Sequence, residues 1–237
     1  MCTLVLLLRP GELLAVSGNR NELLSRPSSG PRIEHGILAP RDEVAHGTWL
    51  GLNQHGLFVC VTNRRAAMID PSRRSRGLLV LEALQAQTAE GLHQALHELR
   101  GDRHNGFHLV YADLREAFVT WSDGQEVRQE ELAPRRVHVI TERSFGAGQG
   151  DRERTVAAAF AKLEPEVSAW REPMTTHASQ PLESACVHAD AVGYGTRSSF
   201  QMVLREKSVE ALWTDGPPCR NPARDISALA TSLLAAG

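Results

Sequence analysis

The sequence predicts an α+β fold in which antiparallel sheets and helices are stacked in layers. Short apolar runs occur in pairs around turn residues, as they do in β-hairpins. Two helical segments stand together in the middle of the chain, with strands before and after them, instead of one helix after each strand. This order favours a layered sandwich over a parallel βαβ sheet. Because the 237 residues contain no internal repeat and no convincing linker, we expect one domain over residues 1–237.

The composition is that of a globular protein and excludes several classes of function. Hydrophobic residues make up 42% and charged residues 23%, and the net charge of −2 argues against a general nucleic-acid or anionic-membrane binder. No apolar run approaches the roughly 18 residues of a membrane span, and Leu4–Leu8 lacks the basic leader of a signal peptide. The four cysteines show no CxxC or metal-ligand spacing, so we expect free thiols, a cytoplasmic location and no metal site.

The first third of the chain predicts two hairpins. Leu4–Leu8 and Leu13–Val16 flank Arg9-Pro10-Gly11-Glu12, a turn signal, and the second strand delivers the polar run Asn19-Arg20-Asn21-Glu22 beside the N-terminus. Residues 24–46, rich in Pro, Gly and Arg, are expected to form a loop. A second hairpin is predicted over residues 48–52 and 57–62, where Gly56 can take a positive φ.

The rest of the chain predicts helices and further strands. We expect helices at 78–86, 88–99, 152–163 and 224–235, with Thr88 as the N-cap of the second and Pro165 ending the third. We expect strands at 107–112, 117–121, 137–141, 185–188, 198–205 and 210–214. Residues 66–76, 164–182 and the glycine-rich 146–150 are predicted to be irregular.

Cys2 is the first candidate for chemistry. If Met1 is removed, Cys2 carries a thiol and a free α-amine on one residue, which together are a nucleophile and a base. Unperturbed α-amines titrate near about 8 and thiols near about 8.5, so a proton can pass between groups of this kind near neutral pH without large shifts. The alternative is that Cys2 is a chance residue at a frayed end.

Five motifs resemble those of the NRDE family, also called the transport-and-Golgi-organisation group. They are Met1-Cys2-Thr3, Asn19-Arg20-Asn21-Glu22, Gly47-Thr48-Trp49-Leu50-Gly51-Leu52-Asn53, Thr62-Asn63-Arg64 and Tyr194-Gly195-Thr196-Arg197-Ser198-Ser199. They follow the family's order and span most of the chain. The family is similar in turn to N-terminal-nucleophile (Ntn) hydrolases of the choloylglycine hydrolase and penicillin V acylase type. The resemblance therefore implies an αββα sandwich with a cysteine nucleophile that acts on a linear amide or thioester of a small molecule.

The resemblance also assigns roles to residues. Cys2 is expected to be the nucleophile with its α-amine as base, Arg20 to lie beside the thiolate, and Asn63 to donate to the oxyanion. Arg197 is expected to orient the site or its substrate, and Asn21 occupies the position of the family's Asp. The other motif residues expected to contact substrate are Asn19, Trp49, Arg64 and Tyr194.

Two departures from the pattern support an alternative function. Asn21 is neutral where the family has an Asp, and Glu142 stands near the place where the hydrolases have an Asn, so its carboxylate would repel an oxyanion unless it is protonated or turned away. The alternative is a non-enzymatic binding or trafficking protein for haem or for lipid and acyl thioesters on the same scaffold.

Three further features have two interpretations each. His93 and His97 have the i, i+4 spacing of metal or haem ligands, although a polar helix face is the simpler interpretation. Cys186 and His188 form either a thiol–imidazole pair or a packed pair of core residues. The arginines between 64 and 76 either bind an anionic substrate such as a phosphate or carboxylate, or belong to a solvated loop.

Overall fold

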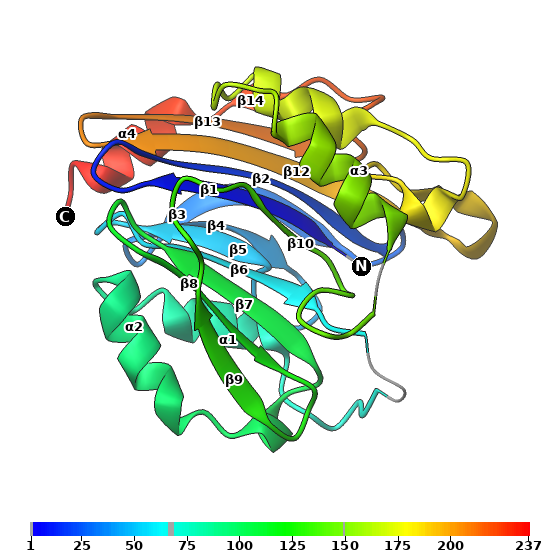
Figure 1. Cartoon of the computed structure of the whole chain (residues 1–237), viewed down its shortest axis with the longest axis horizontal. Coiled ribbons are helices and arrows are strands. Elements are labelled where there is room, and N and C mark those ends of the chain that lie inside the picture. The colour runs from blue at the N-terminus through cyan, green and yellow to red at the C-terminus, as the bar shows by residue number, and fades with distance from the viewer. Residues whose placement is uncertain (1, 66–68, 149) are drawn as a thin grey trace.

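The computed structural model describes residues 2–65, 69–148 and 150–237. Two seven-stranded antiparallel sheets lie face to face, with helices on both outer surfaces (Figure 1). The predicted αββα sandwich is therefore confirmed. Met1, residues 66–68 of the predicted arginine-rich loop and Gln149 of the predicted glycine-rich turn lie outside the described residues. Within the described ranges, no helix is long and apolar enough to cross a membrane.

Sheet I is built around the N-terminal hairpin. Its order is β10 (His138–Ile140), β1 (Thr3–Arg9), β2 (Leu13–Leu23), β12 (Tyr194–Arg205), β13 (Ser208–Asp215) and β14 (Arg224–Asp225), with β11 (His188–Ala189) pairing to the start of β12. The predicted hairpin is present, but β2 continues to Leu23, so the run Asn19–Glu22 lies inside the strand and not after it.

Sheet II is a meander in which every strand neighbours the next one in the chain. Its order is β3 (Ser28–Glu34), β4 (Ile37–Asp42), β5 (Leu50–Asn53), β6 (Phe58–Asn63), β7 (Phe107–Ala112), β8 (Ala117–Ser122) and β9 (Val127–Glu131). The predicted loop at residues 24–46 is wrong, because two strands occupy most of it. Both β3 and the unpredicted β9 are polar, largely exposed edge strands, and therefore lack the apolar alternation that marks a strand in sequence.

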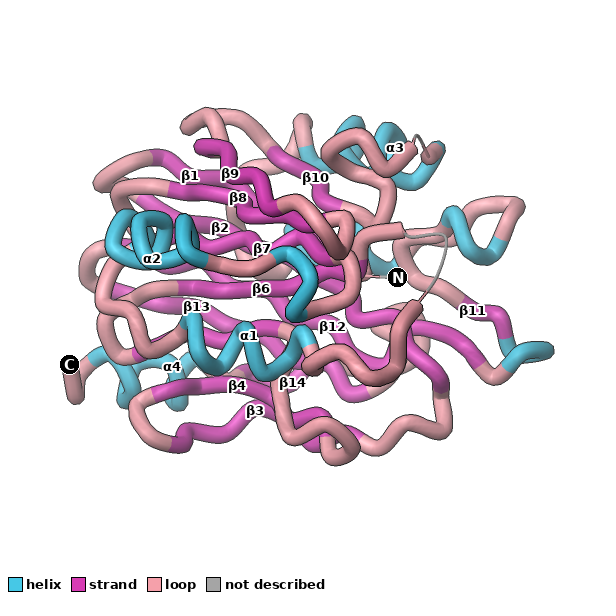
Figure 2. The backbone as a smooth tube through the Cα atoms, turned by 90° about the horizontal axis from the view of Figure 1, so that it is seen from below, coloured by secondary structure: helices cyan, strands magenta, loops and turns pink. Residues whose placement is uncertain are grey.

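Helices α1 (Arg76–Ala83), α2 (Ala89–Ala95) and α3 (Asp151–Phe160) cover the outer faces of the two sheets. Figure 2 shows α1 and α2 lying across sheet II, while α3 packs on sheet I. The last helix, α4 (Ser227–Leu234), contacts β13 of sheet I and β3, β4 and β5 of sheet II, and its Ala230 and Leu233 belong to the core between the sheets. Each of these helices is shorter than predicted, and residues 164–182 contain a 3₁₀ helix at Ala169–Thr175 and part of another at Pro181–Glu183.

Strand alternation divides the buried apolar side chains among three layers. In β1, Leu4, Leu6 and Leu8 point into the core between the sheets, whereas Val5 and Leu7 point toward the layer that contains α3. A third core lies between sheet II and the α1–α2 layer. Because side chains alternate along a strand, each polar residue of the hairpin is assigned to the core or to the α3 layer by its position.

Candidate active site

The registers of sheet I place Cys2 between a basic and an acidic side chain. Extending the antiparallel pairing of β1 with β2 and with β10 brings Cys2 level with Arg20 on one side and Glu142 on the other. Cys2 continues the series that points between the sheets, and it is 7% exposed. The nucleophile expected from the sequence thus lies at the end of the inter-sheet core, where the apolar side chains stop.

A cavity of about 180 Å³ opens at this point. Its lining includes Cys2, Arg20, Asn21, Trp49, Asn63 and Arg76. All of these except Arg76 were proposed from the sequence as site residues, and they come from four separate motifs, since Arg20 and Asn21 belong to the same one. The structure therefore brings most of the predicted site together around one hollow.

Arg20 is held by a half-buried acid, Asp42, that the sequence did not reveal. Its Nη2 donates to Asp42 Oδ2 at 2.7 Å, and Arg26 Nε donates to the same oxygen at 2.6 Å. Burial favours protonation of Asp42, but hydrogen bonds from Arg26 and the Ala45 backbone, with the charges of both arginines, outweigh it and lower the pKa of the carboxyl. Asp42 was missed because it lies in the segment predicted to be a loop.

The lining also contains buried donors that have no hydrogen-bond partner among the described residues. Nη1 of Arg20 and Nε1 of the Trp49 indole are of this kind. Buried donors are nearly always satisfied, and an unpaired one costs about 1–3 kcal/mol. Both side chains line the same cavity as Cys2. Arg20 and Trp49 therefore each bring an unpaired buried N–H group to the wall of the cavity.

Close glycine contacts set the position of Trp49. A Cβ on Gly18 would meet the Trp49 ring at 3.3 Å, so the absence of a side chain there lets the indole pack against β2. A Cβ on Gly47 would collide with the backbone of Gly77 at the start of α1, and Thr48 N donates to Gly77 O at 3.1 Å beside this contact. The motif around Trp49 therefore fixes both the indole and the beginning of α1 at the cavity.

Arg76 is a second lining residue, which the sequence suggested only as one of the arginines that could bind an anion. It is the first residue of α1, and its Nη1 donates to Gly106 O at 2.9 Å. Burial lowers the pKa of its guanidinium, while the nearby Cys2 and Glu22 act in the opposite direction. It belongs to the arginine-rich stretch, whose alternative role as an anion-binding segment was the signal available in the sequence.

The remaining four predicted site residues do not line the cavity in the part of the chain that the structure describes. Each uses its side chain to hold a backbone carbonyl: Asn19 those of Met174 and Ala185, Arg64 that of Phe145, Tyr194 that of Asn21, and Arg197 that of Arg26. Asn19 has this position because alternation in β2 points it toward the α3 layer, away from Arg20. A direct role for these four in substrate binding stays a prediction.

Glu142, which raised doubt in the sequence, forms an ion pair. Its carboxylate accepts from Arg152 Nη2, and Arg143 Nε lies 3.7 Å from its other oxygen. Both partners of the Glu142–Arg152 pair are buried, with side chains 8% and 2% exposed. The carboxylate is therefore neutralised and directed at α3, which removes the expected repulsion of an oxyanion at Cys2. The other departure, Asn21, accepts a hydrogen bond from Thr196 Oγ1 at 2.7 Å.

His93 lies on a packed helix face. Its Nδ1 is 2.8 Å from the Tyr111 hydroxyl, and its ring stacks on Phe118 at a centroid distance of 4.3 Å. His97 contacts the His93 ring edge-on at 5.4 Å. The polar helix face expected from the sequence therefore holds for the exposed His97, whereas His93 is half-buried and packs against sheet II.

The family model "Transport and Golgi organisation 2" matches residues 1–162. The chain belongs to this family. The Transport and Golgi organisation protein 2 homologue of Homo sapiens is 33% identical over 109 residues, which are 46% of this chain and 36% of the human protein. The Mus musculus homologue is 32% identical over 106 residues, 45% of this chain and 34% of its own. The match thus spans about a third of the length of these relatives.

Solved structures similar to this family member are Ntn hydrolases. The Caenorhabditis elegans orthologue of N-acylethanolamine-hydrolyzing acid amidase covers 85% of this chain and 92% of its own, with a TM-score of 0.60 and 13% identity. The C2A mutant of conjugated bile acid hydrolase from Clostridium perfringens covers 95% of this chain and 96% of its own, with a TM-score of 0.55 and 11% identity. At these identities the likeness establishes the fold, which agrees with the resemblance found in the sequence.

Proposed function

We propose that this protein is an Ntn-type cysteine hydrolase or acyltransferase that acts on the amide or thioester of a small molecule. The observation that carries the proposal is the position of Cys2. The residue that becomes N-terminal on removal of Met1 lines a cavity with Arg20, Trp49 and Asn63. A thiol, a cation and neutral donors around one space support the proposal, because acyl transfer requires a nucleophile and donors for the negative oxygen.

The reaction follows from these groups. The Cys2 sulfur attacks the substrate carbonyl carbon, and its α-amine takes the thiol proton and passes it to the leaving group. Asn63 and the unpaired N–H groups of Arg20 and Trp49 are the candidate donors for the negative oxygen that forms. The acyl group is then carried on the Cys2 sulfur as a thioester, and attack by water or by a second nucleophile releases it.

The lining favours a small substrate with an anionic group. The cavity of about 180 Å³ is below the roughly 300–1,000 Å³ of sites that enclose drug-sized ligands. Arg20 of sheet I and Arg76 of α1 both line it, and guanidinium groups recognise carboxylates well. The similar structures are described as acting on N-acylethanolamine and on conjugated bile acids. An N-acyl amino acid combines an amide with the carboxylate that these arginines can bind.

The test begins with the N-terminus. Mass spectrometry of the native protein is expected to show loss of Met1, and iodoacetamide followed by peptide mapping is expected to modify Cys2. Cys60 is the internal control, because it is fully buried and burial raises its pKa well above the usual thiol value. Retention of Met1, or equal labelling of Cys2 and Cys60, contradicts the mechanism.

Activity is then compared on two substrates that differ in one group. An N-acylglycine and the N-acylethanolamine of the same acyl chain share the amide and differ in the carboxylate. We expect faster hydrolysis of the N-acylglycine, no activity in Cys2→Ala, and loss of the preference in Arg20→Gln. A Cys2→Ala protein as active as the wild type rules the proposal out.

The alternative of a haem or acyl-thioester binding protein needs a different measurement. A haem macrocycle would require the cavity to open well beyond its present volume. A Soret titration with a saturable, stoichiometric change that persists in Cys2→Ala, together with no turnover of either amide, favours this alternative.

A further inference from the structure

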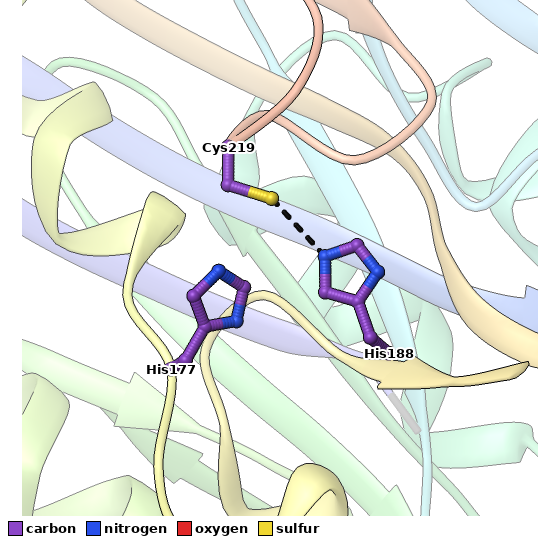
Figure 3. Close-up of side chains that lie close together, drawn as sticks. All are labelled: His177, His188 and Cys219. Carbon is purple, nitrogen blue, oxygen red and sulfur yellow. Dashed lines mark hydrogen bonds between the residues drawn. The ribbon is translucent and has the colours of Figure 1, made fainter.

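Four sulfur and imidazole side chains converge on the outer side of sheet I, in a region that the Cys2 site does not use. They come from two separate segments: His177, Cys186 and His188 lie between the 3₁₀ helix at Ala169–Thr175 and β12, and Cys219 lies in the turn after β13. Figure 3 shows the two imidazoles and the Cys219 thiol turned toward one another. The possible ligand atoms of these three residues all lie within 4.8 Å of one another.

The distances among Cys186, His188 and Cys219 match the edges of one face of a tetrahedral metal site. His188 Nε2 lies 3.1 Å from Cys219 Sγ, Cys186 Sγ lies 3.5 Å from Cys219 Sγ, and Cys186 Sγ lies 3.7 Å from His188 Nε2. Zinc–sulfur bonds of about 2.3 Å and zinc–nitrogen bonds of about 2.0–2.1 Å imply edges of about 3.8 Å between sulfurs and about 3.5 Å between sulfur and nitrogen. All three measured edges are within about 0.5 Å of these values.

His177 is oriented as a ligand imidazole usually is. Its Nδ1 lies 3.1 Å from the carbonyl oxygen of Cys186, which can only accept, so Nδ1 carries the proton and Nε2 keeps its lone pair. A backbone carbonyl on the second nitrogen is the common way to fix the tautomer and direction of a metal-binding histidine. His177 is the exposed member of the group, and its possible ligand atom lies within 4.8 Å of those of His188 and Cys219.

The segment that carries Cys186 and His188 is anchored before any metal binds. Asn19 Nδ2 donates to Ala185 O at 2.8 Å, and Val187 N donates to Thr196 Oγ1 at 2.8 Å. These hydrogen bonds hold both sides of Cys186, which is fully buried. A partly preformed site of this kind lowers the ordering cost of metal binding.

We propose that His177, Cys186, His188 and Cys219 form a structural zinc site. Two thiolates and two imidazoles in a tetrahedron are the set that zinc prefers, and together with Zn²⁺ they carry no net charge. Four protein ligands leave no open position for catalysis. The metal links the irregular segment before β12 to the turn after β13, and so braces the strand that pairs with Arg20 and Asn21.

The test uses the full chain without a histidine tag, with the thiols reduced and the metal removed. Titration with Co²⁺ is expected to give the visible bands of a tetrahedral ion and near-ultraviolet thiolate-to-cobalt charge transfer, saturating at one ion per chain and displaced by zinc. Elemental analysis of protein purified without chelators is expected to find one zinc per chain. Adding a chelator is expected to lower the melting temperature of the wild type.

Variants at single ligands test each corner of the site. Cys219→Ser is expected to remove most of the charge transfer, and His177→Ala, a change at an exposed residue, is expected to weaken zinc binding at least about tenfold. His97→Ala is the matched control, an exposed histidine of the pair on α2 and the following turn, and should bind as the wild type does. The proposal is overturned if stoichiometric Co²⁺ gives no charge transfer, if Cys219→Ser gives the wild-type spectrum, or if Cys186 and Cys219 are found as a disulfide and bind no metal after reduction.

Discussion

The ion pair between Glu142 and Arg152 provides the sharpest test of how the site is supported. Arg152→Met removes the charge that neutralises a carboxylate 8% exposed, level with Cys2 in the sheet register. Removing one partner of a buried pair costs about 3–5 kcal/mol, because the other charge stays buried without that counter-ion. Arg143, whose Nε lies 3.7 Å from the other oxygen of Glu142, is more exposed and replaces Arg152 only in part. With an m value of about 3 kcal/mol/M in urea, the unfolding midpoint should fall by about 1–1.7 M.

A second change isolates the cause. In Glu142→Gln with Arg152→Met, no charge is left to bury, so we expect most of the lost free energy of unfolding to return. Arg154→Met is the matched control, since Arg154 also lies on α3 but pairs with Asp151 at the surface, with side chains 69% and 75% exposed. It should change the free energy of unfolding by less than about 0.5 kcal/mol. An Arg152→Met protein as stable as this control, or a double variant no more stable than the single one, refutes the reasoning.

Three further results are expected. Gly47→Ala should lower the free energy of unfolding by about 1–3 kcal/mol in urea titration, because its Cβ meets the Gly77 backbone, whereas Gly91→Ala, whose Cβ meets only a hydroxyl at 3.0 Å, should not. Burial lowers the pKa of His108 to about 3, so its neutral form stabilises the fold fully above about pH 6.5 and this contribution is lost as the pH falls toward 3. The free energy of unfolding should therefore fall by about 2 kcal/mol between pH 7 and pH 5 because of His108. His108→Gln should remove this part of the pH dependence, measured by urea titration at several pH values. An unchanged dependence of the free energy of unfolding on pH contradicts the role given to His108. Chelation should lower the melting temperature of the wild type but not of Cys219→Ser, by differential scanning calorimetry.

Local sequence patterns predicted the hairpins, in which the two paired strands are adjacent in the sequence. The hairpin of β1 and β2 was predicted because a turn signal separates two apolar runs, and its register alone sets Cys2 opposite Arg20. The strand Phe107–Ala112 was predicted with its observed bounds for the same reason. Edge strands such as Ser28–Glu34 were missed, since half-exposed polar residues form a strand there only because β4 supplies the hydrogen-bonding partner.

The sequence by itself determined the sandwich, the family and the identity of the nucleophile candidate. Short motifs and hydrophobic periodicity depend only on residues close together in the chain, so they can be recognised without the structure. Only the tertiary structure decided which polar residues of one strand share a space. It turned Arg20 toward the cavity and Asn19 away from it, and it brought Asp42 and Arg76 to the lining from segments whose local pattern does not place them there. It also gathered His177, Cys186 and His188 around Cys219, which lies more than 30 residues further along the chain. Such contacts depend on how distant strands pair, and no local pattern carries that information.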